Sequence, residues 1–186
     1  MNIAFPPRAA ARNVIATSRG YFDLAAPRPA DVDLHDIALA LSRINRFTGH
    51  GVEVVSVARH SVNCYREARA RDLSPGLCQL ALMHDAPEAY VGDVSRPLKS
   101  MLPEYRDIEA AVWQAVATRF GLFSHMPQAI KEIDNIALIT EAGDLFPLHD
   151  RWPGFPEPGF SFGFHPAQVL PDYDAFMLCA AEAHVA

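Results

Sequence analysis

An adjacent histidine and aspartate lie within segment 80–93, which reads LALMHDAPEAYVGD. His84 and Asp85 follow four apolar residues directly. A carboxylate so close to an apolar run usually needs a partner, because burying an unpaired charge is costly. A divalent cation is one such partner, and imidazole with carboxylate is a common ligand pair for Zn, Mn, Fe or Ni. The pair therefore predicts a metal site.

Two further residues of suitable type lie on either side of this pair. His60 precedes it in the word VARHS, and Asp134 follows it in KEIDN. Taken singly, each has an ordinary explanation as a core histidine or a solvated helix acid. Together with His84 and Asp85 they supply two nitrogens and two oxygens, which leaves coordination positions open for water or substrate. This donor set suits Mn, Co, Ni, Fe or Zn, and the sequence does not choose among these ions or exclude Mg.

The order of these residues resembles that of the HD-domain superfamily of metal-dependent phosphohydrolases, above all its bacterial 5'-deoxynucleotidase branch and uncharacterised phage and bacterial HD hydrolases. The similarity covers about residues 37–145. The matching words are INRF at 44–47, VARHS at 57–61, HDAPE at 84–88, GD at 92–93 and ID at 133–134. The resemblance implies that one divalent ion is held by the four residues named above.

The resemblance also places two acids, Glu88 and Asp93, at the reaction centre. Glu88 lies one helical turn after His84, so it can reach a water or a leaving oxygen near the ion. Asp93 could orient the attacking water or protonate the leaving alkoxide. The ordinary alternatives are a solvated carboxylate for Glu88 and a helix N-cap for Asp93.

Three cations and one aromatic residue are the candidates for substrate binding. The resemblance implies that Arg46 contacts substrate, and Arg96 and Lys99 are also placed in the sequence to meet phosphate oxygens. Phe47 occupies a position where the family has tryptophan. Because the indole N–H is absent, we expect weak discrimination between ribose and deoxyribose.

These residues together predict a phosphohydrolase that releases phosphate from a small nucleotide-like phosphomonoester by attack of metal-activated water. Between Asp85 and Asp134 the chain has only one histidine, His125, which favours one metal over a binuclear site. Ala89 directly after Glu88 counts against the hydrolases of guanosine tetraphosphate. The alternatives are a non-catalytic or regulatory HD protein that binds a nucleotide or metal, and a di-iron HD oxygenase.

The elements that must position these side chains are helices, and the sequence predicts an all-α fold. We expect an HD-domain bundle of about six or more helices, with an irregular N-terminal segment and a loop rich in proline and phenylalanine, 147–170, before the last helix. An extended piece is expected at 21–24. The expected helices cover about 31–47, 52–71, 74–90 with a kink at Pro87, 104–120, a fifth from Pro127, and 172 to the end.

Length and composition fit this picture. A chain of 186 residues, half of them apolar, suits a single domain, 1–186. A net charge of −6 without a basic stripe argues against a nucleic-acid partner. No run approaches the roughly 20 apolar residues that span a bilayer, so no membrane partner is expected. Cys64, Cys78 and Cys179 are expected to be reduced thiols in a cytoplasmic protein, and a homodimer is left open.

Overall fold

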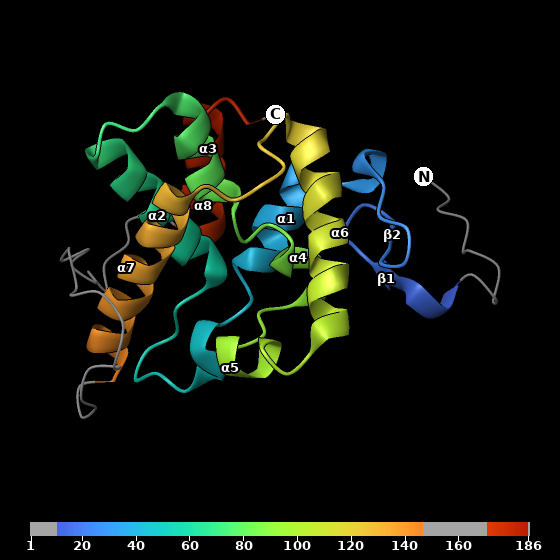
Figure 1. Ribbon diagram of the computed structural model, residues 1–186, viewed down its shortest axis with the longest axis horizontal. Helices are drawn as coiled ribbons and strands as arrows, with labels where there is room; N and C mark the ends of the chain where they lie inside the picture. Colours follow the sequence, from blue (N-terminus) through green and yellow to red (C-terminus); the bar gives the residue numbers. More distant parts are fainter. Residues whose placement is uncertain (1–10, 147–170, 186) are drawn as a thin grey trace.

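The computed structural model describes residues 11–146 and 171–185, and its architecture is all-α with one small hairpin (Figure 1). The helices are α1 Leu34–Leu41, α2 Val57–Ala70, α3 Pro75–Met83, α4 Glu88–Val91, α5 Arg96–Lys99, α6 Pro103–Phe120, α7 Gln128–Leu145 and α8 Asp172–Glu182. Short 3-10 helices cover Ala11–Asn13, Pro29–Asp31 and Arg46–Gly49. Strands β1 Val14–Ala16 and β2 Tyr21–Asp23 pair antiparallel. The predicted fold class is confirmed, and so is the extended piece near residue 21.

Two helices begin where a polar side chain caps them. The Asp33 carboxylate accepts the backbone N–H groups of His35 and Asp36 at the start of α1. The Ser56 hydroxyl accepts the N–H of Arg59, and α2 therefore begins at Val57 rather than at the predicted residue 52.

The predicted helix 74–90 is wrong in its second half. Helix α3 ends at Met83, and a turn leads into the short helix α4 at Glu88. Pro87 explains the break, because it has no N–H and its ring would clash with the carbonyl of Met83 in a continuous helix. The N–H of Ala86 instead bonds to the carbonyl of Met83, and that of Glu88 to Asp85. His84 and Asp85 consequently lie at the end of α3 and in the turn.

The core is organised around α2. Helices α3, α7 and α8 pack against it, and Figure 1 shows these four helices on one side of the molecule. Helix α6 and the hairpin lie on the other side, with α1 and α4 between the two groups. Phe22 of β2 stacks on Tyr90 of α4 with ring centroids 4.0 Å apart, which joins the hairpin to the segment that follows His84.

Other expectations differ in detail. Helix α5 occupies residues that were predicted to be loop, whereas α6 ends as expected at Gly121, which adopts a left-handed conformation with φ 65°. The loop 147–170 lies outside the described residues. None of the helices that the structure describes combines the length and the apolar character needed to cross a membrane.

Candidate metal centre

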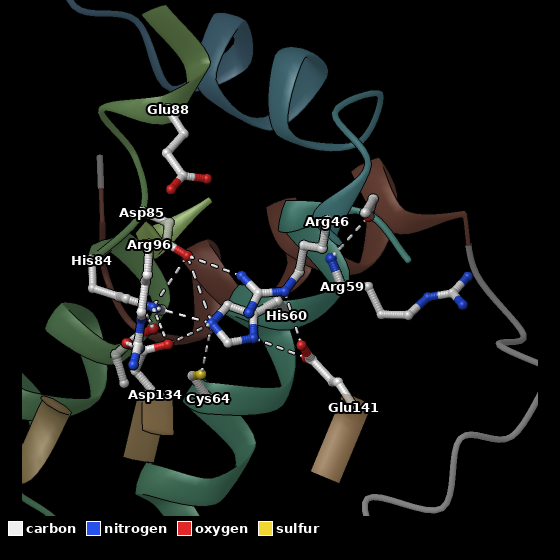
Figure 2. A network of polar contacts seen from close by, with 12 residues as sticks. Arg46, Arg59, His60, Cys64, His84, Asp85, Glu88, Arg96, Asp134 and Glu141 are labelled. Atoms are coloured by element: carbon white, nitrogen blue, oxygen red, sulfur yellow. Dashed lines mark hydrogen bonds and ion pairs between the residues drawn. The ribbon is translucent and has the colours of Figure 1, made fainter. Parts of the chain in front are cut away.

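The structure brings the four predicted ligands together at the junction of α2, α3 and α7 (Figure 2). His60 Nε2 lies 3.3 Å from His84 Nε2, 3.3 Å from Asp134 Oδ1 and 3.6 Å from Asp85 Oδ2. His84 Nε2 lies 3.3 Å from Asp85 Oδ2 and 4.0 Å from Asp134 Oδ1. Ligand atoms about 2.1 Å from one ion lie about 3.0–3.5 Å from each other. The donor atoms are therefore close to the spacing that one cation requires.

The four predicted ligands come from different elements and differ in exposure. His60 projects from the middle of α2 and its side chain is completely buried, while the His84 side chain is 6% exposed. The carboxylates of Asp85 and of Asp134, on α7, are 19% and 25% exposed. The imidazoles thus form the floor of the site, and the carboxylates face outward.

Cys64 adds a third type of donor next to the histidines. It lies one turn after His60 on α2, and its Sγ is 3.6 Å from His60 Nε2. Donor atoms of His60, Cys64 and His84 lie within 4.8 Å of one another, so these residues form a group that could hold a metal ion. The thiol is fully buried, and burial raises its pKa.

The charges within the cluster depend strongly on one another. Burial by itself would raise the pKa of Asp134, but the hydrogen bond with His60 and the charge of His84 lower it to about 2. The pKa of Asp85 is likewise well below its usual value, because the imidazoles of His84 and His60 outweigh burial. Both histidine pKa values are raised in turn, although burial opposes the rise. The two carboxylates stabilise positive charge on the imidazoles, and they would stabilise a divalent cation at the same place.

Both imidazoles are held in the tautomer that a metal requires. His84 Nδ1 is 2.9 Å from the Ala81 carbonyl, and His60 Nδ1 is 2.8 Å from Glu141 Oε1. Because a carbonyl and a carboxylate oxygen can only accept, each Nδ1 donates, and in the neutral ring that binds a metal each Nε2 directs its lone pair toward the cluster. Such partners on the far side of the ring are usual for metal-binding histidines.

Sequence reasoning assigned no functional role to Glu141. It follows Asp134 by seven residues on α7, and a spacing of about two turns puts both acids on one helix face. Its side chain is fully buried, and Oε2 accepts a second bond from Arg46 Nε at 2.8 Å. Burial would raise its pKa, but the charges of Arg46 and His60 lower it. The spacing from Asp134 was the only available signal, and surface acids on helices often share it.

A pocket of about 640 Å³ opens next to the cluster and includes every predicted catalytic and substrate-binding residue in its wall. These are Arg46, Phe47, Glu88, Asp93, Arg96 and Lys99. The predicted ligands Asp85 and Asp134 also line it, whereas Cys64 does not. Residues from four stretches of the chain, 46–48, 85–88, 93–99 and 134–138, therefore meet around one cavity that reaches the carboxylate side of the cluster.

Glu88 is a buried acid with an unused oxygen. The residue is 6% exposed, and its Oε2 has no hydrogen-bond partner among the described residues. Burial raises its pKa well above the usual value, and the negative charges of Asp85 and Asp93 add to the rise. The pKa of Asp93 is also raised, chiefly by burial. An acid in this environment holds its proton at a pH where free glutamate has lost it.

The three predicted substrate cations are each paired with an acid. Arg46 Nη1 lies 3.6 Å from Asp85 Oδ2, in addition to its bond to Glu141. Arg96 Nη2 lies 2.6 Å from Asp134 Oδ2, and Lys99 Nζ lies 2.6 Å from an oxygen of Glu109. Lys99 Nζ is also 4.0 Å from Glu88 Oε1.

Phe47 contributes an apolar wall in an unusual backbone conformation. Its ring packs edge-on against Phe146, with centroids 5.4 Å apart. Phe47 and the β-branched Thr48 both have φ 54°, in the left-handed region. Such conformations are costly for residues other than glycine and tend to occur at functional sites.

No protein-family model matches the chain. It is similar to the uncharacterised protein YfdR of Escherichia coli K12, with 39% identity over 115 residues, 62% of this chain and 62% of YfdR. The match thus spans less than two thirds of that relative. The chain is also similar to the uncharacterised protein RCAP_rcc00048 of Rhodobacter capsulatus, with 34% identity over 151 residues, 73% of this chain and 76% of that protein.

Proposed function

The chain belongs to the same family as the uncharacterised protein RCAP_rcc00048, and from its site we propose that it is a metal-dependent phosphohydrolase of the HD type. The observation that carries the proposal is the meeting of two imidazoles and two carboxylates at one edge of a pocket. That pocket also holds two further acids and three cations. Ligands, proton donors and phosphate-binding groups are the parts that hydrolysis of a phosphate ester needs.

His60, His84, Asp85 and Asp134 would hold one divalent ion. When bound, such an ion polarises a phosphoryl oxygen and makes water more acidic. The protein residues then have to bind the anionic ester, orient it and supply a proton.

The three cations of the pocket would bind the phosphate. Arg46 and Arg96 have planar, multiply donating head groups that match phosphate oxygens, and Lys99 adds a compact charge. The Phe47 ring supplies an apolar surface for the remainder of the substrate. This combination supports a small nucleotide-like phosphomonoester as the substrate class.

Glu88 would act as the general acid. Its raised pKa favours the protonated form, which can give a proton to the leaving oxygen as the bond from that oxygen to phosphorus breaks. Asp93 would orient the attacking water. Both acids line the pocket next to Asp85, within reach of an ester bound there.

The competing donor set is His60, Cys64 and His84. We favour the two carboxylates over the thiol, because Asp85 and Asp134 line the pocket whereas Cys64 is fully buried and does not line it. An ion held through the carboxylates has open positions where substrate can reach it, as a catalytic site requires.

Substitutions separate the two donor sets. His84→Ala should strip bound metal and activity together, and Asp134→Ala should do the same, because each removes a direct ligand. Cys64→Ser should keep both. Elemental analysis of the purified variants measures the metal, and phosphate release is assayed with nucleoside monophosphates and phosphodiesters in the presence of Mn²⁺, Co²⁺ or Mg²⁺.

Unchanged metal content in His84→Ala would contradict the ligand assignment, and loss of metal in Cys64→Ser would favour the thiol set. A protein that binds metal but releases phosphate from none of these compounds would favour a regulatory role. Oxygen uptake by an iron-loaded protein would favour the di-iron oxygenase.

A further inference from the structure

We propose that Glu141 is a positioning residue that links the metal ligand His60 to the substrate-binding Arg46, so that metal binding and anion binding depend on one carboxylate. The inference rests on the proposed function and adds a residue to it. Figure 2 shows the Glu141 carboxylate in contact with both side chains. Its Oε1 is 2.8 Å from His60 Nδ1, and its Oε2 is 2.8 Å from Arg46 Nε.

The environment of Glu141 leaves it little freedom. Its side chain is 0% exposed, and the side chains of His60 and Arg46 are 0% and 9% exposed. Solvent water therefore has little access to replace either hydrogen bond. The contacts also join distant parts of the chain, since Glu141 is 81 residues from His60 and 95 from Arg46.

One bond acts on the metal ligand. With Nδ1 donating to Glu141, the lone pair of His60 Nε2 is directed to the point where Asp134 Oδ1 and His84 Nε2 each lie 3.3 Å away. Loss of such a partner frees the ring and lowers the basicity of the ligand nitrogen, and typically weakens metal affinity 10–100-fold.

The second bond acts on the arginine. Fixing Nε orients the guanidinium plane, and Nη1 then lies 3.6 Å from Asp85 Oδ2 at the wall of the pocket. An arginine held in this way meets a phosphate without first losing side-chain freedom. Because α7 carries both Asp134 and Glu141, this one helix would fix the relative positions of the ion, the His60 imidazole and the Arg46 guanidinium.

Glutamine is the informative replacement at this position. It keeps the shape of glutamate but has a single acceptor oxygen, so its amide group would face one of the two donors. Glu141→Gln therefore cannot keep both bonds. The matched control is Glu67→Gln on α2, since Glu67 is also buried and accepts from an arginine, Arg71, but lies outside the pocket and the cluster.

The test measures binding without turnover. Titration with Mn²⁺ should show metal affinity reduced about 10–100-fold in Glu141→Gln and unchanged in Glu67→Gln. Titration of the metal-loaded protein with inorganic phosphate should show affinity reduced about tenfold or more in Glu141→Gln and in Arg46→Ala. The double variant should lose little more than either single one, because both act through the same contact.

Wild-type affinity for both Mn²⁺ and phosphate in Glu141→Gln would overturn the proposal, and so would additive losses in the double variant. Glu141→Asp serves if the glutamine variant does not fold. It keeps the charge but draws the carboxylate back by one methylene, so both affinities should again fall, and unchanged values would overturn the proposal as well. If the wild-type protein binds Mn²⁺ and phosphate but hydrolyses nothing, the proposed function is wrong. The titrations still test the role of Glu141 in that case, because they measure binding and not turnover.

Discussion

Glu88 shows how one residue obtains a chemical property from its surroundings. Free glutamate is ionised at neutral pH, but Glu88 is 94% buried next to Asp85 and Asp93, and one of its oxygens lacks a hydrogen-bond partner within the described parts of the chain. Burial and the two negative charges all disfavour its ionised form. Lys99, 4.0 Å away, offsets this only in part. The side chain is therefore suited to donate a proton.

Glu88→Gln should reduce turnover about 100-fold or more while metal content is retained, because glutamine keeps the shape but has no proton to transfer. The pH dependence has a definite sign. A group with a raised pKa loses its proton as pH rises through that value, so wild-type turnover should fall on the alkaline side of the raised pKa. Turnover of the Glu88→Gln variant should not show this alkaline decrease.

The measurement is kcat against pH for both proteins, with bound metal determined in parallel. Near-normal turnover in Glu88→Gln, or an unchanged decrease of kcat at alkaline pH, would show that Glu88 has only a structural role.

At the scale of elements, the start of α2 is tied to the start of α8. The Asp172 carboxylate accepts a hydrogen bond from the Ser56 hydroxyl at 2.6 Å and one from Arg59 Nε at 3.1 Å. The Ser56 hydroxyl oxygen also caps α2 by accepting the N–H of Arg59 at 3.0 Å. Because α2 carries His60, helix α8 helps to fix the helix from which this proposed metal ligand projects.

Asp172→Ala should lower the free energy of unfolding by about 1–3 kcal/mol, because it leaves the buried Ser56 and the partly buried Arg59 without this acceptor. Asp174→Ala is the matched control, since Asp174 lies in the same first turn of α8 but is exposed. Urea denaturation in the presence of a chelator measures the free energy of unfolding of both variants without a contribution from bound metal. Equal losses in the two variants would assign the effect to the helix dipole rather than to the contact with α2.

The elements could largely be predicted from the sequence, and their ends only where a local signal exists. Apolar periodicity identified the long helices, and Gly121 fixed the end of α6. The break after Met83 was underestimated, because Pro87 was expected to kink a helix that in fact stops four residues earlier. The short helix α5 was missed, because its four residues, one of them Pro97, are too few to show a periodic pattern.

At the scale of the whole molecule, the candidate ligands could be predicted but their surroundings could not. His84 and Asp85 stand together in the sequence, and residue type and order were enough to add His60 and Asp134. The role of Glu141 depends on contacts with residues 81 and 95 positions away, which nothing local specifies. The same holds for the cations of the pocket, whose pairing with acids was not foreseen.

The unequal exposure of the four proposed ligands has a consequence for how quickly the site would exchange an ion. An ion from solvent meets the Asp134 and Asp85 carboxylates first, since these are 25% and 19% exposed, whereas the imidazoles of His84 and His60 are 6% and 0% exposed. The outward-facing carboxylates should therefore set the association rate of the ion, and the buried nitrogens should set its dissociation rate. Stopped-flow mixing with Co²⁺ measures the association rate and the dissociation rate separately. Asp134→Asn should chiefly slow association, and His84→Gln should chiefly speed dissociation. The reverse pattern would mean that ions reach the site from the side of the core.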